Sequence, residues 1–211
     1  MVSAIAQPTP ARHTTRLTPG RQAKPAPRQI TWREFKSRYL RREDGYKYEW
    51  VNGTVEKTRR SMDKTQLFIL RNLLDFFLLL KTKGTVSGQL ISEPDLFFLA
   101  NHRRPDVAWL TNEQIDRLAY ESDDVPAFII EVISTNDQMN LVHRKMQNYQ
   151  AAGVQVVWHV FPVLGIVHVY AGERLEKMTV CSGDDVCSAA PALPAFAMPV
   201  GDILKKPAKP A

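Results

Sequence analysis

The sequence predicts a mixed α/β domain built around one main sheet. Segments with helical and strand periodicity alternate along the chain: a short helix and a hairpin, a longer helix, and then strands interleaved with two further helices. The 211 residues are 44% hydrophobic and 24% charged, which is typical of a globular domain with tails. No apolar run approaches the roughly 20 residues of a membrane helix, and the N-terminus lacks the apolar stretch of a secretory signal. We therefore expect a cytoplasmic protein with no membrane segment.

The net charge of +6 comes from the two ends of the chain. Residues 1–29 hold five basic residues, no acidic residue and five of the 14 prolines, so we expect a disordered tail. An organelle transit peptide is the alternative interpretation. Residues 205–211 form a second basic tail, and residues 30–204 form the folded domain. Because that domain is nearly balanced in charge, the overall charge does not indicate a DNA-binding body.

Order is expected to begin at Thr31, which forms a capping box with Glu34. A short helix to about Leu40 follows. Two strand-like runs within residues 46–57 flank Asn52-Gly53, a dipeptide that favours a tight hairpin turn. The longest helix is expected over residues 62–81, where apolar residues recur at helical spacing.

The second half of the chain alternates strands with shorter helices. Strands are expected over residues 85–91, 95–99 and 106–110, followed by a short helix over 112–120. An apolar strand over 127–133 precedes a helix over 138–151, which should end at Gly153, a typical C-terminal cap. Strands over 154–160, 166–170 and 175–180 complete the pattern.

Glu131 is the most informative candidate because it interrupts an apolar strand. A buried carboxylate is costly unless a cation or a metal pairs with it; an edge strand with Glu131 in water is the alternative. Asp106 begins another apolar strand after Pro105, and its alternative role is that of a turn residue. Two carboxylates entering one sheet could share Mg²⁺, which prefers oxygen ligands and leaves positions for water and phosphate.

Lys145 and Glu49 are further candidates. Lys145 borders the apolar face of the helix after Glu131, where it can reach solvent or point over the sheet towards Glu131. Glu49 lies in the first strand of the hairpin, with an exposed strand residue as the alternative. The chain has no Gly-rich phosphate loop or nucleophile elbow, its histidines lack zinc-site spacing, and its two cysteines cannot complete a zinc site alone. The sequence therefore gives little support to the hypothesis that the protein is a metabolic enzyme.

These candidates fall in segments that together resemble the Uma-two family of restriction-endonuclease-like proteins, part of the PD-(D/E)XK nuclease superfamily. The resemblance spans about residues 31–204, and the segments that carry it are Tyr48–Gly53, Arg104–Leu110, Ile130–Ser134, Lys145–Tyr149 and Gly153-Val154. It implies a restriction-endonuclease-like core, in which helices flank a central mixed sheet, with an N-terminal helix and β-hairpin. It also implies metal-dependent hydrolysis of DNA phosphodiester bonds, with Mg²⁺ or Mn²⁺ as cofactor and DNA as partner.

The resemblance assigns roles to individual residues. Asp106 matches the PD aspartate, Glu131 the acid of the E-x-K motif, and Lys145 a lysine displaced to the following helix. Glu49 matches the family's N-terminal acid. The implied metal ligands are Asp106, Glu131 and the Val132 carbonyl. Candidate phosphate contacts, with solvated loop charge as the alternative, are Arg59, Arg60, Arg103 and Arg104.

The chain also departs from the family pattern around these residues. Ile133 stands at the E-x-K lysine position, as is usual in this family, but the chain differs from the pattern at Asn52, Gln66, Thr135-Asn136, Leu141 and Phe161. Because the polar surroundings have changed, the alternative function is a catalytically degenerate protein that binds nucleic acid or a protein partner. A homodimer is compatible with the sequence, which fixes neither the oligomeric state nor a DNA sequence preference.

Overall fold

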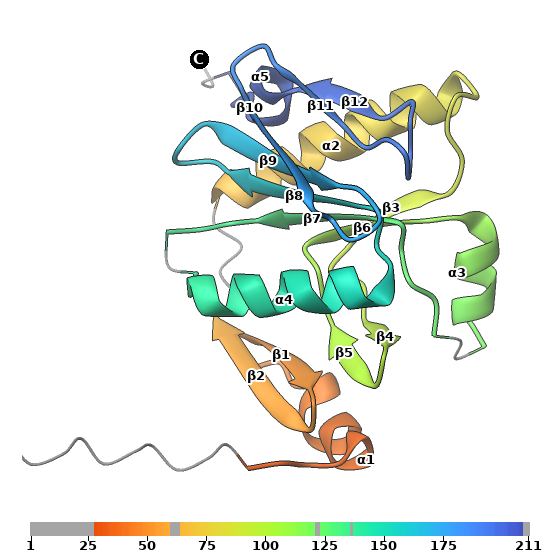
Figure 1. Ribbon diagram of the computed structural model, residues 1–211, viewed down its shortest axis with the longest axis vertical. Coiled ribbons are helices and arrows are strands. Elements are labelled where there is room, and N and C mark those ends of the chain that lie inside the picture. Colours follow the sequence, from red (N-terminus) through yellow and green to blue (C-terminus); the bar gives the residue numbers. More distant parts are fainter. Residues whose placement is uncertain (1–27, 60–63, 121–122, 136, 209–211) are drawn as a thin grey trace, which may run out of the picture.

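A six-stranded mixed sheet forms the centre of the molecule (Figure 1). The structure is a computed structural model that describes residues 28–59, 64–120, 123–135 and 137–208. In the order β10-β9-β8-β7-β6-β3, the strands are β10 (Lys177–Ser182), β9 (Ile166–Ala171), β8 (Val156–Phe161), β7 (Phe128–Val132), β6 (Val107–Leu110) and β3 (Gln89–Ser92). The β7–β8 pair is parallel and the other neighbouring pairs are antiparallel. The predicted α/β class with a central mixed sheet is confirmed.

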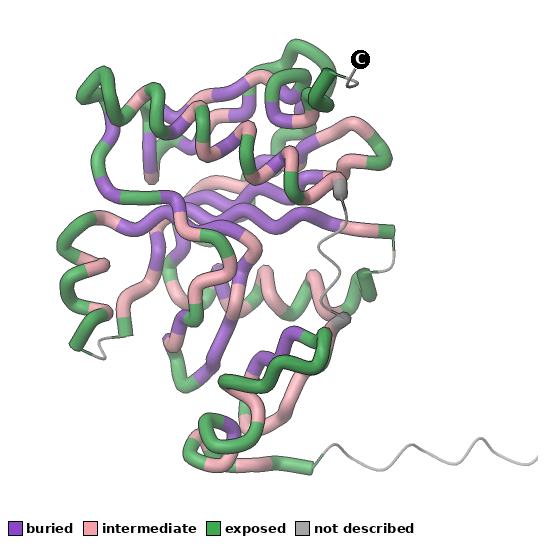
Figure 2. The backbone as a smooth tube through the Cα atoms, turned by 180° about the vertical axis from the view of Figure 1, so that it is seen from behind, coloured by how far each residue is buried: buried purple, intermediate pink, exposed green. Residues whose placement is uncertain are grey.

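Helices cover both faces of this sheet (Figure 1). One face packs against α2 (Lys64–Thr82), and the other packs against α4 (Met139–Ala152). Alternate side chains of β7 point to opposite faces of the sheet. Phe128 and Ile130 belong to the hydrophobic cluster under α2, whereas Ile129 packs with Tyr149 of α4. Figure 2 shows the central strands as a buried band between more exposed layers.

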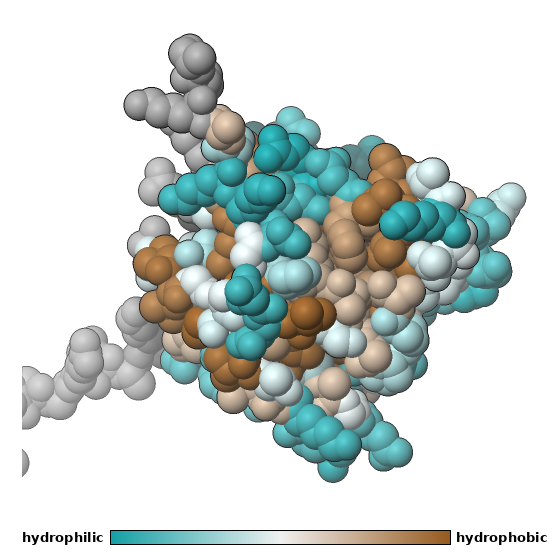
Figure 3. Space-filling model, turned by 90° about the horizontal axis from the view of Figure 1, so that it is seen from above, coloured by the Kyte–Doolittle hydropathy of each residue, from teal (hydrophilic) through white to brown (hydrophobic). Residues whose placement is uncertain are grey.

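The C-terminal segment completes the α2 side of the sheet. It forms a two-stranded ribbon, β11 (Val186–Ser188) with β12 (Ala197–Pro199), and the short helix α5 (Val200–Ile203). Three leucines of α2 are exposed: Leu67, Leu78 and Leu79. Figure 3, which views the molecule from this end, shows hydrophobic residues mixed with hydrophilic ones.

A second, four-stranded antiparallel sheet lies on the far side of α4 (Figure 1). We call it the small sheet. In the order β2-β1-β5-β4, its strands are β2 (Thr54–Arg59), β1 (Tyr46–Val51), β5 (Asn101–Arg103) and β4 (Leu96–Phe98). The N-terminal helix α1 (Trp32–Phe35), which continues as the π-helical turn η1 (Lys36–Leu40), packs on it through aromatic contacts. The Trp32 ring, for example, stacks on Phe97 at a centroid distance of 4.7 Å.

The predicted N-terminal helix and hairpin are confirmed, with two differences. The Thr31 hydroxyl accepts from the Glu34 amide at 3.2 Å, but the Glu34 carboxylate pairs with Arg28 and Arg38 rather than closing the capping box. Ordered structure also begins earlier in the chain than expected, because Gln29 forms an isolated antiparallel β-bridge with Thr54 of β2. The Asn52-Gly53 turn has φ values of 48° and 79°, as a tight hairpin turn requires.

Other elements differ from the sequence prediction mainly in length. Helix α3 (Asn112–Leu118) forms with a complete Thr111–Gln114 capping box, whereas β3 begins at Gln89 and is shorter than expected. Strands β5, β11 and β12 and helix α5 were not predicted. β5 is polar in sequence and β12 contains a proline, so neither shows the apolar alternation of a strand.

Some predictions fall outside the described residues. These are the expected disorder of residues 1–27 and 209–211 and the role of Arg60. Within the part of the chain that the structure describes, no helix has the length and apolar character needed to cross a membrane.

Substituting Gly88 by alanine should destabilise the fold more than the same change at Gly84. Both glycines have positive φ, 77° and 71°, so alanine is strained at either by about 1 kcal/mol. At Gly88 an added Cβ would also overlap the Leu110 carbonyl oxygen of β6, whereas at Gly84 the space is open. We expect the loss in Tm, measured by thermal unfolding, to be at least about twice as large for Gly88→Ala as for Gly84→Ala. In a domain of this size, 1 kcal/mol corresponds to a shift in Tm of roughly 2–4 °C. Equal losses would contradict this packing argument.

Candidate active site

Asp106 and Glu131 face each other at the end of two neighbouring strands. The register of β6 and β7 pairs Val107 with Ile130, so Asp106, one residue earlier, falls opposite Glu131. Because side chains alternate along a strand, both carboxylates point to the α4 face of the sheet. Both line a pocket of about 90 Å³, which is large enough for several water molecules.

Glu131 is buried and is held by two residues of α4. The Lys145 ammonium donates to its Oε1 and Oε2 at 2.9 and 3.0 Å, and the Tyr149 hydroxyl donates to Oε1 at 2.6 Å. Lys145 and Tyr149 are four residues apart, so they lie on the same face of the helix. Burial raises the pKa of Glu131 above its ordinary value; Lys145 opposes this effect, and the charge of Asp106 adds to it.

Asp106 is held by the small sheet and by the backbone of β7. Its Oδ1 accepts from the Lys47 ammonium of β1 at 3.1 Å, and its Oδ2 accepts from the Val132 amide at 2.8 Å. Burial would raise the pKa of Asp106, but Lys47, Lys145 and the Val132 amide together lower it below its ordinary value. Asp106 is therefore ionised near neutral pH, and a quarter of its side chain remains exposed.

The Val132 carbonyl is directed towards Asp106. The amide and carbonyl of one strand residue point to the same side of the strand, and the Val132 amide points at Asp106. The last β6–β7 pair is Val107 with Ile130, so Val132 lies beyond the paired region, and it is one of the residues that line the pocket with the two acids.

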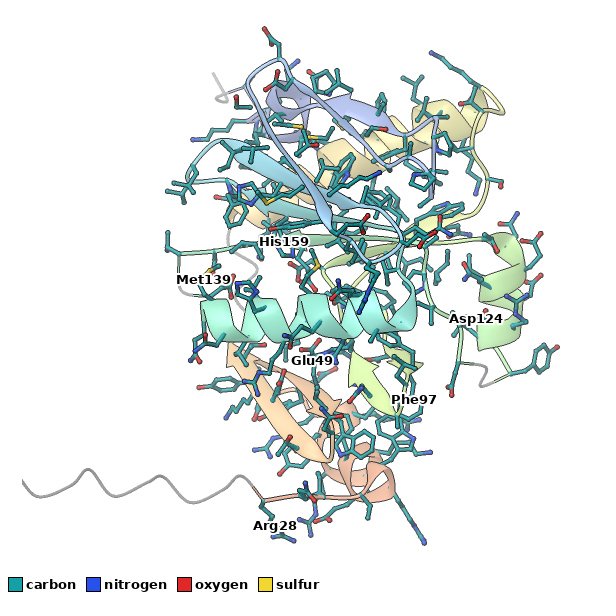
Figure 4. All side chains as sticks on the ribbon, viewed as in Figure 1. Arg28, Glu49, Phe97, Asp124, Met139 and His159 are labelled. Atoms are coloured by element: carbon teal, nitrogen blue, oxygen red, sulfur yellow. The ribbon has the colours of Figure 1, made fainter. Side chains whose placement is uncertain are left out.

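Glu49 belongs to β1 of the small sheet and lies beside α4 (Figure 4), within reach of Lys145. Its Oε1 accepts from the Arg104 amide at 2.7 Å and lies 3.7 Å from the Lys145 Nζ, and its Oε2 accepts from the Arg103 guanidinium at 3.0 Å. Burial would raise the pKa of Glu49, but Lys145, Arg103, Lys47 and the Arg104 amide lower it to about 2. Glu49 does not line the pocket, and this geometry suits a residue that positions Lys145.

Arg103 ties the small sheet to α4. Its side chain is 0% exposed, and Nη1 contacts Glu56 at 2.7 Å as well as Glu49. Its Nε donates to the Asn148 side chain of α4 at 3.0 Å. Glu49 and Glu56 are paired directly across the hairpin, where two like charges are unfavourable without a cation between them. Arg103 supplies that cation.

The predicted phosphate contact at Arg103 is wrong. Its guanidinium is fully buried and already bound to two carboxylates and an amide, so it cannot reach a phosphate. The Arg104 guanidinium is also engaged, since both Nε and Nη2 donate to Asp95 at 2.8 Å. The side chain of Arg59 and all of Arg60 lie outside the described residues.

Three residues of the site were missed by the sequence analysis: Lys47, Tyr149 and His159. Lys47 precedes Glu49 by two residues and so shares its face of β1, and Tyr149 follows Lys145 by one helical turn. His159 pairs with Glu131 across β7 and β8 and lines the same pocket. Burial, followed by the charges of His168, Lys145 and His143, lowers the pKa of His159 to about 4, so its ring is neutral near pH 7.

The donor atoms around the pocket fit a hard divalent cation. Within the described ranges, no group of three or more His, Cys, Asp or Glu side chains is placed to hold a metal. Mg²⁺ does not need such a group, because one or two carboxylates suffice when water and substrate phosphate supply the other oxygen ligands. Asp106 and Glu131, with the Val132 carbonyl beside them, provide such a set.

Comparison with solved structures defines the class of the fold. The chain is similar to a crystal structure described as a "putative nuclease belonging to DUF820 from Anabaena variabilis ATCC 29413". The TM-score is 0.67 and the sequence identity is 17%, over 83% of this chain and 97% of that chain. This likeness shows that the two chains share one fold, a mixed α/β fold in which helices flank a central mixed sheet.

The sequence comparison gives the family. Residues 32–201 match the Uma2 family, which is described as "Putative restriction endonuclease". The chain belongs to this family, as the sequence segments predicted. No curated protein matches the chain.

Replacing Arg103 with methionine should destabilise the protein strongly. The change leaves Glu49 and Glu56 buried without their shared cation, a loss worth about 3–5 kcal/mol for a broken buried pair. Arg104→Met is the matched control: its partner Asp95 is 44% exposed, so water can replace the lost contact. We expect urea unfolding to show a loss at least about twice as large for Arg103→Met. Similar losses in the two variants would show that Arg103 does not stabilise the acid pair.

Glu49→Gln should cost more stability at pH 6 than at pH 3. The pKa of Glu49 falls from 4.5 to about 2 on folding, so the folded protein binds the proton less tightly than the unfolded chain. The resulting stabilisation, on the order of 3 kcal/mol, is fully present above pH 4.5 and is lost as the pH falls through 2. Urea unfolding of both proteins at the two pH values measures the difference. A cost that does not change with pH would contradict the lowered pKa.

Proposed function

We propose that this protein is a metal-dependent endonuclease that hydrolyses DNA phosphodiester bonds in the pocket formed by Asp106 and Glu131. The observation that carries the proposal is the pairing of these carboxylates on adjacent strands, with the Lys145 ammonium on Glu131. Membership of a family described as "Putative restriction endonuclease" supports it, as does similarity to a structure described as a "putative nuclease".

Asp106, Glu131 and the Val132 carbonyl would hold Mg²⁺ or Mn²⁺. When bound, such an ion polarises the phosphate and stabilises the leaving oxygen. The site's own residues must then orient the attacking water, carry its proton and stabilise the charge that gathers on the phosphate.

Lys145 and His159 suit these tasks. Hydrolysis joins a water oxygen to phosphorus and breaks the bond to one ester oxygen, so negative charge builds up on the phosphate. The Lys145 ammonium, at the wall of the pocket, can donate to a phosphate oxygen or to the attacking water. His159 lines the same pocket with a neutral ring, so one ring nitrogen can accept a hydrogen bond from that water and orient it. Glu49, whose Oε1 lies 3.7 Å from the Lys145 Nζ, holds Lys145 in place from the small sheet.

A nucleic-acid-binding protein without catalytic activity is the second candidate. One observation favours it: Lys145 and Lys47 already pair with both pocket carboxylates, so the metal-free site is stable as it stands. Gln66 and Leu141, two positions where the chain departs from the family pattern, also line the pocket. Under this alternative the protein would bind DNA without cutting it.

The cleavage assay tests the catalytic proposal. We expect the purified protein to nick or linearise plasmid DNA in the presence of Mg²⁺ or Mn²⁺ and to be inactive in EDTA. Glu131→Gln should reduce the rate by about 10²-fold or more, since it removes a metal-binding carboxylate while keeping the size of the side chain.

Glu113→Gln is the matched control for this assay. Glu113 is an exposed residue in the first turn of α3, outside the pocket, so the variant should cut DNA like the wild type. DNA binding without cleavage in either metal would support the second candidate instead. Equal activity of Glu131→Gln and the wild type would reject the proposed site.

A further inference from the structure

Lys47 is a lysine in an unusual environment. Lysine side chains are rarely buried unless they are paired, yet the Lys47 side chain is 9% exposed. It extends from β1 of the small sheet into the pocket of the main sheet, and its Nζ meets Asp106 Oδ1 at 3.1 Å. It therefore bridges the two sheets at the proposed catalytic acid.

Every oxygen of the two pocket acids is already bound by the protein. Asp106 uses Oδ1 for Lys47 and Oδ2 for the Val132 amide. Glu131 uses both oxygens for Lys145, and Tyr149 shares Oε1. A divalent cation that binds these acids would lie within a few ångströms of the ammonium groups that already neutralise them. Because like charges repel strongly at such distances, at least one ammonium is expected to move away.

Lys47 is the donor that can leave most easily. The Val132 amide is fixed in the backbone of β7. Lys145 is held by both oxygens of Glu131 and lies near Glu49. Among the described residues, the Lys47 ammonium donates one hydrogen bond, from the end of a flexible four-carbon stem, and the Asp106 side chain is open to the pocket on one side.

On the basis of the proposed function, we infer that Lys47 is a resident counter-cation of Asp106 that competes with the divalent metal for the Oδ1 oxygen. In the metal-free protein it neutralises Asp106 and fastens the small sheet to the main sheet. When a divalent metal binds Oδ1, the Lys47 ammonium is released into the pocket. The metal itself adds two positive charges to the same pocket. The freed ammonium then favours binding of an anionic group such as a substrate phosphate, so metal and substrate should bind cooperatively.

Metal binding by Lys47→Met, without DNA, tests this inference. Methionine keeps most of the stem and removes the ammonium. We expect its dissociation constant for Mg²⁺, measured by calorimetry, to be at least about tenfold lower than that of the wild type, because a competing unit charge at this distance has been removed. The metal-free variant should also melt at a lower temperature, and Mg²⁺ should raise its Tm by more than it raises that of the wild type.

Lys57→Met is the matched control. Lys57 lies in β2 of the same hairpin, is exposed and contacts the Tyr46 ring rather than the pocket, so its Mg²⁺ affinity should equal that of the wild type. If the wild type binds Mg²⁺ and Lys47→Met binds it no more tightly, the competition is rejected while the proposed metal site stands. If neither the wild type nor Lys47→Met binds Mg²⁺ or Mn²⁺, the inference and the proposed metal site both fail.

A measurement on the wild type covers the case in which Lys47→Met does not fold. The side-chain ¹⁵Nζ and ¹³Cε NMR signals of Lys47 should shift as Mg²⁺ saturates the protein, since its ion pair with Asp106 breaks. The signals of Lys57 should stay in place. Mg²⁺ binding that leaves the Lys47 signals unchanged would overturn the inference.

Discussion

The architecture depends on the burial of carboxylates on one face of the main sheet. Asp106 and Glu131 lie side by side on the face that packs against α4, where two unpaired negative charges would be strongly unfavourable. Each carboxylate is paired with a cation from a different element, Lys145 of α4 and Lys47 of β1. The need to neutralise these acids explains why a helix and a second sheet meet at this end of the molecule.

A second set of buried charges supports the first. Glu49 lies behind Lys145, and Arg103 holds Glu49, Glu56 and Asn148 together. Buried ion pairs contribute little net stability, because desolvation offsets most of their attraction. Their value here is geometric: they fix the position of the Lys145 ammonium relative to Glu131, as a site that must bind a metal and a phosphate requires.

The sequence was most informative where a residue conflicted with its surroundings. Glu131 could be found because a carboxylate in an apolar strand needs a partner, and Lys145 because it borders the apolar face of a helix. Lys47 could not be found in this way, since a lysine in a hairpin strand has the pattern of an exposed residue. Arg103 was misassigned for a similar reason: β5 is polar in sequence, and its burial arises only when β1, β4 and α4 close around it. The register that places Asp106 opposite Glu131 is likewise a property of the sheet, which local patterns do not determine.

The order in which the chain is synthesised gives the Lys47–Asp106 contact a further consequence. Its two residues are 59 positions apart, and Tyr149 emerges only about 40 residues after Asp106. At roughly 5–20 residues per second, a ribosome needs several seconds to pass from Lys47 to Tyr149. A nascent chain thus holds the hairpin of the small sheet well before the acids and α4 exist to pair with it. The pocket is completed only once most of the domain has left the ribosome, so incomplete chains carry no assembled site.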